Sequence, residues 1–215
     1  MKAIKPYLDG KTHIIWDWNG TLLNDLDHCI ESIGDLLDEH SLPRVSEKQY
    51  RELFRFPVQE YYRDVGFDFE RTPFEILANG FMTRYLSGVL NCQLFNGTQE
   101  LLSDLKNEGI SHSILSASRE NYLHEQVTYF KIDHYFDAIC GLSDHYAMSK
   151  IARGKQLIEQ LNLPLSSTLL IGDTDHDLAV GNELGVEVLL LGDGHQSATR
   201  LQRIHPKVLA TREPK

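Results

Sequence analysis

The sequence predicts an α/β fold, a Rossmann-like doubly wound parallel sheet with helices on both of its faces. Short and almost continuously apolar runs alternate with helical patterns along the 215 residues, without an internal repeat. Strands that are covered on both faces have this apolar character, and alternation of strands with helices is typical of a parallel sheet. The predicted strands are 13–16, 113–116, 138–141, 168–171 and 186–191.

A long insertion is predicted after the first strand. About a hundred residues separate the first strand from the second, far more than a parallel crossover needs. Apolar residues in this gap recur at spacings of three and four, in the series 29–37 and 74–86, which indicates amphipathic helices. We therefore predict a small α-helical cap domain over residues 23–94, inserted into a core domain formed by residues 1–22 and 95–215.

Composition and charge exclude several classes of protein. The formal net charge of −10 argues against a nucleic-acid or anionic-membrane partner, because such partners select basic surfaces. No apolar run has the length of a signal peptide core or of a membrane helix, so we expect a cytoplasmic protein. The three cysteines are not spaced as a disulfide framework or a zinc site.

Polar clusters follow three of the predicted strands at their carboxyl ends, where open parallel sheets bind ligands. Carboxylates that meet at such an edge supply the hard oxygen ligands that Mg²⁺ prefers. The hydroxyl of Ser116, with backbone N–H groups of Gly20 and Ala117, can hold phosphoryl oxygens. The clusters are Asp17-Trp18-Asn19-Gly20-Thr21, Ser116-Ala117-Ser118 and Gly172-Asp173-Thr174-Asp175-His176-Asp177.

These three clusters, in this order, resemble the haloacid dehalogenase superfamily, in its phosphoglycolate-phosphatase-like branch with a helical cap after the first strand. The resemblance spans nearly the whole chain. It implies a Mg²⁺-dependent hydrolase of small phosphate esters, in which Asp17 is the nucleophile that forms an aspartyl-phosphate and Ser116 binds phosphate. It also implies a lysine that balances the charge; Lys150 stands nearest to the family's position, and Lys155 is the weaker candidate.

The resemblance further implies the metal ligands. Asp173 matches the metal-binding aspartate of the family, and Asp177, four residues later, could face it from the first turn of a helix. Asp17 and the backbone carbonyl of Asn19 complete the expected Mg²⁺ site. The expected partner is a small phosphorylated metabolite, and neither its identity nor the oligomeric state follows from the sequence.

Asn19 departs from the pattern of the family. The phosphatases carry an aspartate there, which protonates the leaving group and then activates water, help worth ~10² to 10⁴ in rate. The amide of Asn19 cannot transfer that proton. Four explanations are open: a slow phosphatase, a substrate whose leaving group needs no acid, a neighbouring acid such as Asp25 or His176, or a protein without turnover. We favour retained but weak hydrolysis.

Two other activities of this superfamily agree less well with the sequence than hydrolysis does. A phosphomutase also needs the missing acid and base, although the Ser-Ala-Ser cluster is similar to that of β-phosphoglucomutases. The metal-independent dehalogenases of the superfamily also lack the second aspartate, but the intact Asp173 and Asp177 argue against that assignment. A binding or regulatory protein that has lost turnover is the main alternative to an enzyme.

The substrate specificity is expected to lie in the cap. Three arginines could bind a substrate carboxylate, although a hydrated helix face is the simpler interpretation. The aromatic side chains are most simply the core of the cap, with Phe56-Pro57 as a possible loop over the active site. The arginines are Arg51, Arg55 and Arg63, and the aromatic residues are Phe54, Phe56, Tyr61 and Tyr62.

Overall fold

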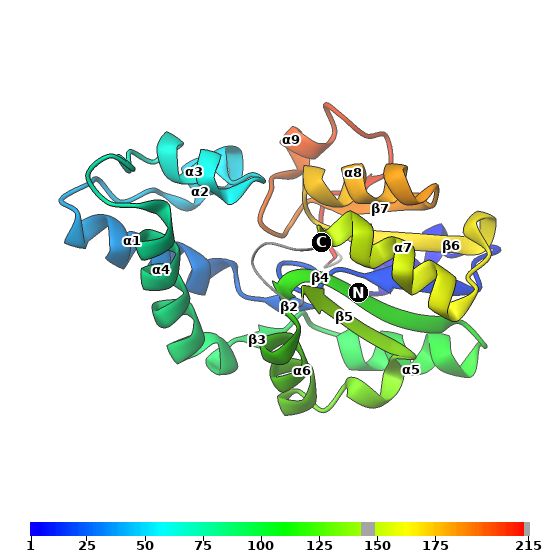
Figure 1. Cartoon of the computed structure of the whole chain (residues 1–215). Helices are drawn as coiled ribbons and strands as arrows, with labels where there is room; N and C mark the ends of the chain where they lie inside the picture. Colours follow the sequence, from blue (N-terminus) through cyan, green and yellow to red (C-terminus); the bar gives the residue numbers. More distant parts are fainter. Residues whose placement is uncertain (143–148, 213–215) are drawn as a thin grey trace.

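A computed structural model describes residues 1–142 and 149–212 of the chain (Figure 1). The centre of the structure is a six-stranded parallel sheet with the strand order β5-β4-β1-β6-β7-β8, which confirms the predicted fold class. The five predicted strands are present, and the two-residue strand β8 was not predicted because it is too short to form a pattern. The strands are β1 (His13–Trp16), β4 (Ser111–Arg119), β5 (Ala138–Leu142), β6 (Thr168–Gly172), β7 (Glu187–Leu191) and β8 (Val208–Leu209).

Helices cover both faces of this sheet (Figure 1). Neighbouring residues of β1 belong to different hydrophobic clusters: Ile15 to one, Ile14 and Trp16 to the other. This alternation is the period of two expected for a strand that is buried on both faces. Helices α7 (Lys150–Leu161) and α8 (Asp175–Leu184) pack on the Ile15 face, and α5 (Thr98–Asn107) and α6 (Glu120–Tyr129) pack on the opposite face.

The position of β1 decides where a site can form. β1 pairs with β4 on one side and with β6 on the other, both in parallel, so the carboxyl ends of the three strands lie at one edge of the sheet. The chain runs outward from β1 to β4 and β5 on one side and to β6 and β7 on the other. Such a switch in strand order opens a crevice at the carboxyl edge of a doubly wound sheet.

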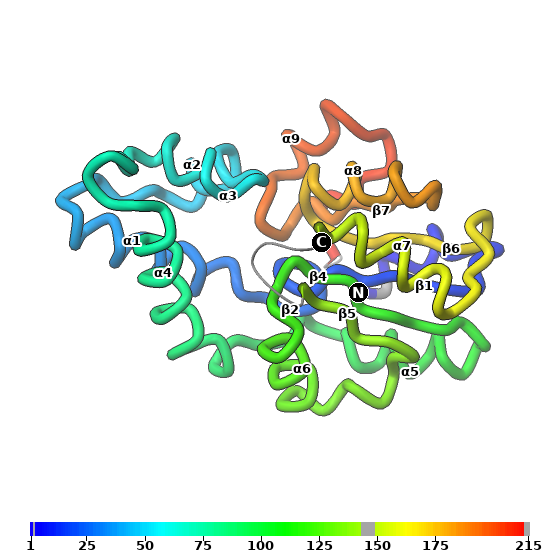
Figure 2. Tube along the Cα trace, viewed as in Figure 1, coloured from blue at the N-terminus to red at the C-terminus, as the bar shows by residue number. Residues whose placement is uncertain are grey.

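Four helices lie between β2 (Leu23–Asn24) and β3 (Gln93–Leu94) in the sequence and to one side of the six-stranded sheet in space (Figure 2). These two short antiparallel strands pair where the chain leaves the sheet and where it returns. The division into a cap domain and a core domain at residues 23–94 stays a prediction. The helices are α1 (Leu26–Glu39), α2 (Glu47–Leu53), α3 (Val58–Asp64) and α4 (Phe74–Gly88).

The starts of these helices follow from local sequence. The Ser46 hydroxyl accepts a hydrogen bond from the N–H of Gln49, and the N–H of Ser46 donates to the Gln49 side chain, a capping box that begins α2. Pro57 and Pro73 occupy the N-cap positions of α3 and α4, where a missing N–H costs nothing. The short helix α9 (Ala198–Leu201) and the 3₁₀ helices complete the chain: Lys2–Tyr7, Val89–Asn91, Asp133–Tyr135 and Leu165–Ser167.

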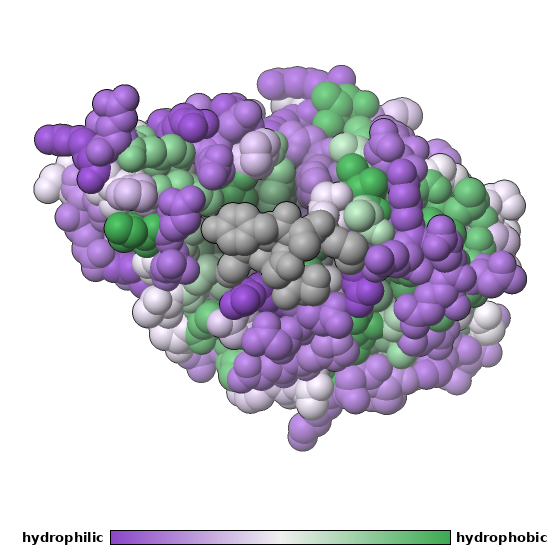
Figure 3. All heavy atoms as spheres, viewed as in Figure 1, coloured by the Kyte–Doolittle hydropathy of each residue, from purple (hydrophilic) through white to green (hydrophobic). Residues whose placement is uncertain are grey.

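The surface is mainly hydrophilic on the face shown in Figure 3, with hydrophobic patches between the polar residues. The large hydrophobic side chains that are exposed, such as Ile76 and Ile204, come from different elements of the fold. Among the described residues, no helix has both the length and the apolar character needed to cross a membrane.

Candidate active site

A cavity of about 400 Å³ lies between the four inserted helices and the carboxyl edge of the sheet. Residues that follow β1 and β6 and residues of the carboxyl-terminal part of β4 line it on the core side, and residues of all four inserted helices line it on the other. The three polar clusters of the sequence therefore meet at one cavity, as their positions at strand ends predicted.

Lys150 joins two of the carboxylates at the bottom of this cavity. Its Nζ atom lies 2.6 Å from Oδ1 of Asp17 and 2.6 Å from Oδ1 of Asp177, and all three side chains are buried. Lys150 is the first residue of α7, and Ser149 caps this helix through the N–H of Ala152. Lys155, the second lysine considered, is exposed and lies 4.0 Å from Glu183, away from the carboxylates.

Asp177 is fixed by the start of α8. Its Oδ2 atom accepts hydrogen bonds from the N–H of Asp173, from the N–H of Thr174 and from the Thr174 hydroxyl, at 3.2, 3.0 and 2.6 Å. Thr174 and Asp177 form a capping box, so one carboxylate orients the loop after β6 and also contacts Lys150. Although burial opposes ionisation, the Lys150 ammonium lowers the pKa of Asp177.

Asp17 and Asp173 are buried close to each other and to Asp177. Burial, together with the charges of Asp177 and Asp173, raises the pKa of Asp17 to about 8 against the opposing charge of Lys150. Burial likewise raises the pKa of Asp173 to about 6, although its Oδ2 accepts a 2.5 Å hydrogen bond from the N–H of His195. When all three carboxyl groups of this cluster are ionised, the single ammonium of Lys150 leaves an excess of negative charge, and the resulting repulsion contributes to the raised pKa values of Asp17 and Asp173.

This cluster fits a divalent cation. One ligand atom from each of Asp17, Asp173 and Asp177 lies within 4.8 Å of the others, and all three residues are buried. Carboxylate oxygens are the ligands that Mg²⁺ takes, and a cation would offset the charge that Lys150 leaves unbalanced. The backbone carbonyl of Asn19, two residues after Asp17, stays a predicted fourth ligand.

The side chain of Asn19 uses all of its hydrogen-bonding groups. Its Nδ2 atom donates to Oδ2 of Asp25 and to the hydroxyl of Tyr85, each at 2.7 Å. Its Oδ1 atom accepts from the hydroxyl of Ser118 at 2.8 Å. Asn19 is therefore held in one orientation by groups from α4, from the loop before α1 and from β4.

Asp25 is an ionised carboxylate that accepts hydrogen bonds from four N–H and O–H donors, and a longer one from the Cys29 thiol at 3.6 Å. Besides Asn19, the donors are the N–H of Gly20 at 2.9 Å, the hydroxyl of Tyr85 at 2.8 Å and Nε2 of His195 at 3.2 Å. Burial opposes ionisation, but the charge of His195 and these donors lower the pKa of Asp25 to about 2. Asp25 therefore holds no proton at neutral pH, which disfavours it as a substitute acid.

His195, like Arg119 and Tyr85, is one of the cavity-lining residues that the sequence analysis missed. Its Nδ1 atom pairs with the hydroxyl of Tyr50 at 3.1 Å, and Asp25 raises its pKa to about 9 against the effect of burial. His195 thus carries a positive charge and joins α2 of the insertion to the core. It follows the carboxyl end of β7, so the strand-end rule that selected the other clusters could have found it.

Gly20 and Ser116 differ in how well they suit a phosphate. The N–H of Gly20, predicted to bind phosphate, donates instead to Asp25, and Gly20 does not line the cavity. A Cβ atom at Gly20 would lie 2.2 Å from Oδ2 of Asp173, and its φ of +66° favours glycine, so close packing explains this residue. Ser116 and Ala117 both line the cavity; the Ser116 hydroxyl oxygen accepts from the N–H of Ser118 at 3.1 Å and keeps its own hydrogen for a ligand.

His176 also lines the cavity. Its ring stacks on Phe56, with 4.5 Å between centroids and 28° between planes. Burial lowers the pKa of His176, so this ring is neutral at neutral pH and cannot serve as an acid there.

The arginines of the insertion lie outside the cavity. Arg51 donates to the carbonyl of Gly192 and pairs with Glu47. Arg55 pairs with acidic residues of the α3 region, and Arg63 lies over the ring of Phe69. The cavity therefore does not use these arginines to bind a substrate carboxylate, although Arg51 is held against the carbonyl of Gly192 and not on a hydrated helix face.

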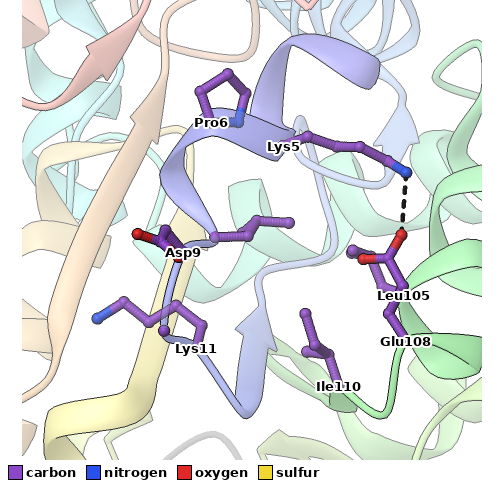
Figure 4. Close-up of a pocket in the computed structure, with 9 residues that line it drawn as sticks. Lys5, Pro6, Asp9, Lys11, Leu105, Glu108 and Ile110 are labelled. Atoms are coloured by element: carbon purple, nitrogen blue, oxygen red, sulfur yellow. Dashed lines mark hydrogen bonds and ion pairs between the residues drawn. The ribbon is translucent and has the colours of Figure 1, made fainter.

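A second hollow, of about 430 Å³, lies beside the N-terminal 3₁₀ helix and α5 (Figure 4). None of the three polar clusters lines it. Lys5 there contacts Glu108 at 3.3 Å and Asp104 at 3.2 Å, so its charge is paired within the surface. We assign no function to this hollow.

Comparison with known proteins identifies the class to which this fold and site belong. Residues 14–191 match the haloacid dehalogenase-like hydrolases, and the chain belongs to this family. It is 27% identical over 201 residues to a Pseudomonas aeruginosa protein named 5'-nucleotidase, with 90% of this chain and 88% of the relative covered. It is 21% identical over 180 residues to the putative pyrophosphatase PpaX of Caldanaerobacter subterraneus, with 81% and 79% covered.

A solved structure confirms the fold. A haloacid dehalogenase-like family hydrolase from Streptococcus pneumoniae superposes with a TM-score of 0.80 at 21% identity, over 96% of each chain. The family match and the names of the relatives confirm the predicted class of enzyme, a phosphatase of this family.

Proposed function

We propose that the chain hydrolyses small phosphate esters with Mg²⁺, through an aspartyl-phosphate formed on Asp17. The observation that supports this proposal most is the position of Lys150, whose Nζ lies 2.6 Å from both Asp17 and Asp177 beneath the cavity. A buried ammonium beside a carboxylate can offset the repulsion between that carboxylate and an incoming phosphoryl dianion.

Each side chain at the edge of the sheet has a role in this proposal. Asp17 attacks phosphorus, the P–O bond to the leaving group breaks, and water later attacks phosphorus to release phosphate and restore the Asp17 carboxylate. The Ser116 hydroxyl and the N–H of Ala117 bind the phosphoryl oxygens. Lys150 keeps Asp17 oriented and offsets its charge. Four residue positions would hold Mg²⁺: Asp17, Asn19 through its carbonyl, Asp173 and Asp177.

Mg²⁺, when bound there, supplies positive charge that withdraws electron density from the phosphoryl group. Asp177 already accepts four hydrogen bonds, so it orients the loop after β6 and the side chain of Lys150. It could also bind a metal or a metal-bound water. Asn19 supplies no proton, because its side chain is a fully hydrogen-bonded amide.

Phosphate release from p-nitrophenyl phosphate tests this function. We expect release with Mg²⁺, loss of release with excess EDTA, recovery when Mg²⁺ is restored, and at least a 1000-fold fall in Asp17→Asn, in line with the loss of a nucleophile. Asp9→Asn, on the surface beside the second hollow, is the matched control and should keep the native rate. Equal rates in the native chain and in Asp17→Asn would refute the role of Asp17.

A binding protein without turnover is the second candidate, and the observation that favours it is Asn19. In that case the native chain would bind inorganic phosphate with Mg²⁺ but release none from any ester. Release by Asn19→Asp alone would identify the native chain as a phosphate binder on a phosphatase scaffold.

A further inference from the structure

We infer that the substrates of this site are aryl phosphates, small esters whose leaving group is a phenol held among the aromatic side chains of the cavity. This inference rests on the proposed function and narrows its substrate class. Two independent observations carry it: the lack of a proton donor at Asn19, and the chemical character of the cavity walls.

The first observation concerns the leaving group. In the proposed reaction the Asp17 carboxylate forms a bond to phosphorus, and the ester oxygen departs with the electron pair of the broken P–O bond. An alkoxide that departs this way needs a proton, and the position two residues after Asp17 would have to supply it. Asn19 there has no acidic proton, and its Nδ2 hydrogens are donated to Asp25 and Tyr85.

Asp25 cannot take over this role on geometric grounds. Both of its oxygens accept hydrogen bonds from N–H or O–H donors: Oδ1 from Gly20 and His195, Oδ2 from Asn19 and Tyr85. The groups around Asn19 therefore stabilise the ionised form of the Asp25 carboxylate and fix the orientation of the Asn19 amide.

A phenol is a leaving group that needs no acid. A phenolic hydroxyl has a pKa near 10, whereas the pKa of water, which is comparable to that of a simple alcohol, is about 15.7. The phenolate departs as a stable anion and takes its proton from water afterwards. Because a general acid contributes ~10² to 10⁴ in rate, its absence penalises alkyl esters by about that factor and aryl esters far less.

The second observation concerns the walls of the cavity. Aromatic rings from the insertion line it on one side, and Tyr122 and His176 line it on the core side. The ring of His176 already stacks on Phe56, which shows that flat rings pack face to face at this position. The aromatic residues of the insertion that line the cavity are Tyr50, Phe54, Phe56, Tyr61, Tyr62, Phe74, Phe81 and Tyr85.

The volume of the cavity suits this occupant. An apolar cavity of roughly 150 Å³ holds a benzene ring, so about 400 Å³ accommodates a phenyl ring together with a phosphoryl group. The aromatic walls on the insertion side would bind the ring by burial and stacking, while polar side chains such as Arg119 and Gln126 line the cavity on the core side.

Nucleoside phosphates are the main competing class, because their bases are also aromatic. Their phosphate, however, is an ester of an alcohol. The missing acid therefore disfavours their hydrolysis, whereas the aromatic walls do not disfavour their binding. Rates and affinities measured separately distinguish these two effects.

The first test compares rates with Mg²⁺ for phenyl phosphates of rising leaving-group pKa, for glycerol phosphate and for a nucleoside 5'-phosphate. We expect kcat to fall steeply as the leaving-group pKa rises, and both alkyl esters to react at least about 100-fold more slowly than phenyl phosphate. Equal kcat for phenyl phosphate and either alkyl ester would overturn the inference.

The second test measures binding without bond cleavage. Phenylphosphonate should inhibit at least about tenfold more strongly than methylphosphonate, and Phe56→Leu should lose roughly three- to tenfold of this preference, the range expected for one stacking contact. Phe69→Leu is the matched control, because Phe69 packs within the insertion but does not line the cavity. Equal inhibition by the two phosphonates would also overturn the inference.

Failure of the inference is distinguishable from failure of the proposed function. If no ester releases phosphate in an Asp17-dependent manner, the proposed function fails and this inference fails with it. If alkyl and aryl esters are hydrolysed equally well, the function stands and only the inference is wrong.

Discussion

Asp25→Asn tests whether the buried network behind Asn19 is a main contributor to stability. The carboxylate of Asp25 accepts hydrogen bonds from Asn19, Gly20, Tyr85 and His195. An asparagine of the same shape keeps one oxygen, turns an NH₂ group toward two of these donors and removes the carboxylate that pairs with the buried His195 ring. Hydrogen bonds to a charged group contribute about 1.5–3 kcal/mol each, and removal of one member of a buried ion pair costs about 3–5 kcal/mol.

Because these terms share the same atoms they do not add, so we expect a total loss of about 3–5 kcal/mol in the free energy of unfolding. Urea unfolding followed by tryptophan fluorescence measures it, since Trp16 and Trp18 are fully buried in the folded chain. Asp27→Asn is the matched control: Asp27 is exposed in the first turn of the same helix, and its loss should cost less than about 1 kcal/mol. A loss below about 1 kcal/mol in Asp25→Asn would refute the reasoning.

Three further predictions concern the lysine, the glycine and a core histidine. Lys150→Met should lower phosphate release at least 100-fold, whereas Lys155→Met should keep the native rate; similar losses in the two variants would contradict the assignment. Gly20→Ala should lower the free energy of unfolding by at least about 2 kcal/mol in the same urea assay, because its Cβ would meet Asp173 and its backbone has a positive φ; unchanged stability would refute this. Burial lowers the pKa of His112 from 6.5 to about 4, so the folded chain favours the neutral ring. This contribution to the free energy of unfolding is fully present above pH 6.5. It is lost as the pH falls toward 4, and the loss amounts to about 3 kcal/mol. Urea unfolding between pH 7 and pH 4 measures this loss. The same dependence of the unfolding free energy on pH in the native chain and in His112→Gln would contradict the prediction.

The sequence by itself determined the fold class and the place of the site. The apolar runs predicted five strands because a strand covered on both faces leaves a local signal, whereas β8, with two residues, leaves none. Asp17 and Asp173 follow strands and Ser116 lies in the carboxyl-terminal part of β4, and parallel strands bring their carboxyl ends to one edge, so topology alone predicts that these residues meet.

The resemblance to the family favoured Lys150 over Lys155, because the family has its lysine at a helix start, and helix starts are also local. Ser149 is a typical N-cap, so the residue after it begins α7 and points toward the sheet edge that the helix faces, whereas a residue five positions later lies more than one turn along the helix. The structure brings the first of these lysines to Asp17 and leaves the second exposed.

Only the tertiary structure decided what surrounds Asn19. Asp25 and His195 are 170 positions apart, and Asn19 and Tyr85 are 66 apart, so no spacing rule connects them. In the same network the N–H of Gly20 donates to Asp25, although the sequence pattern predicted that this N–H binds phosphate. Local patterns fix strands, helix starts and strand ends because they depend on neighbours in the chain. The partners of a buried polar group depend on how separate elements pack, and that packing is set by the whole fold.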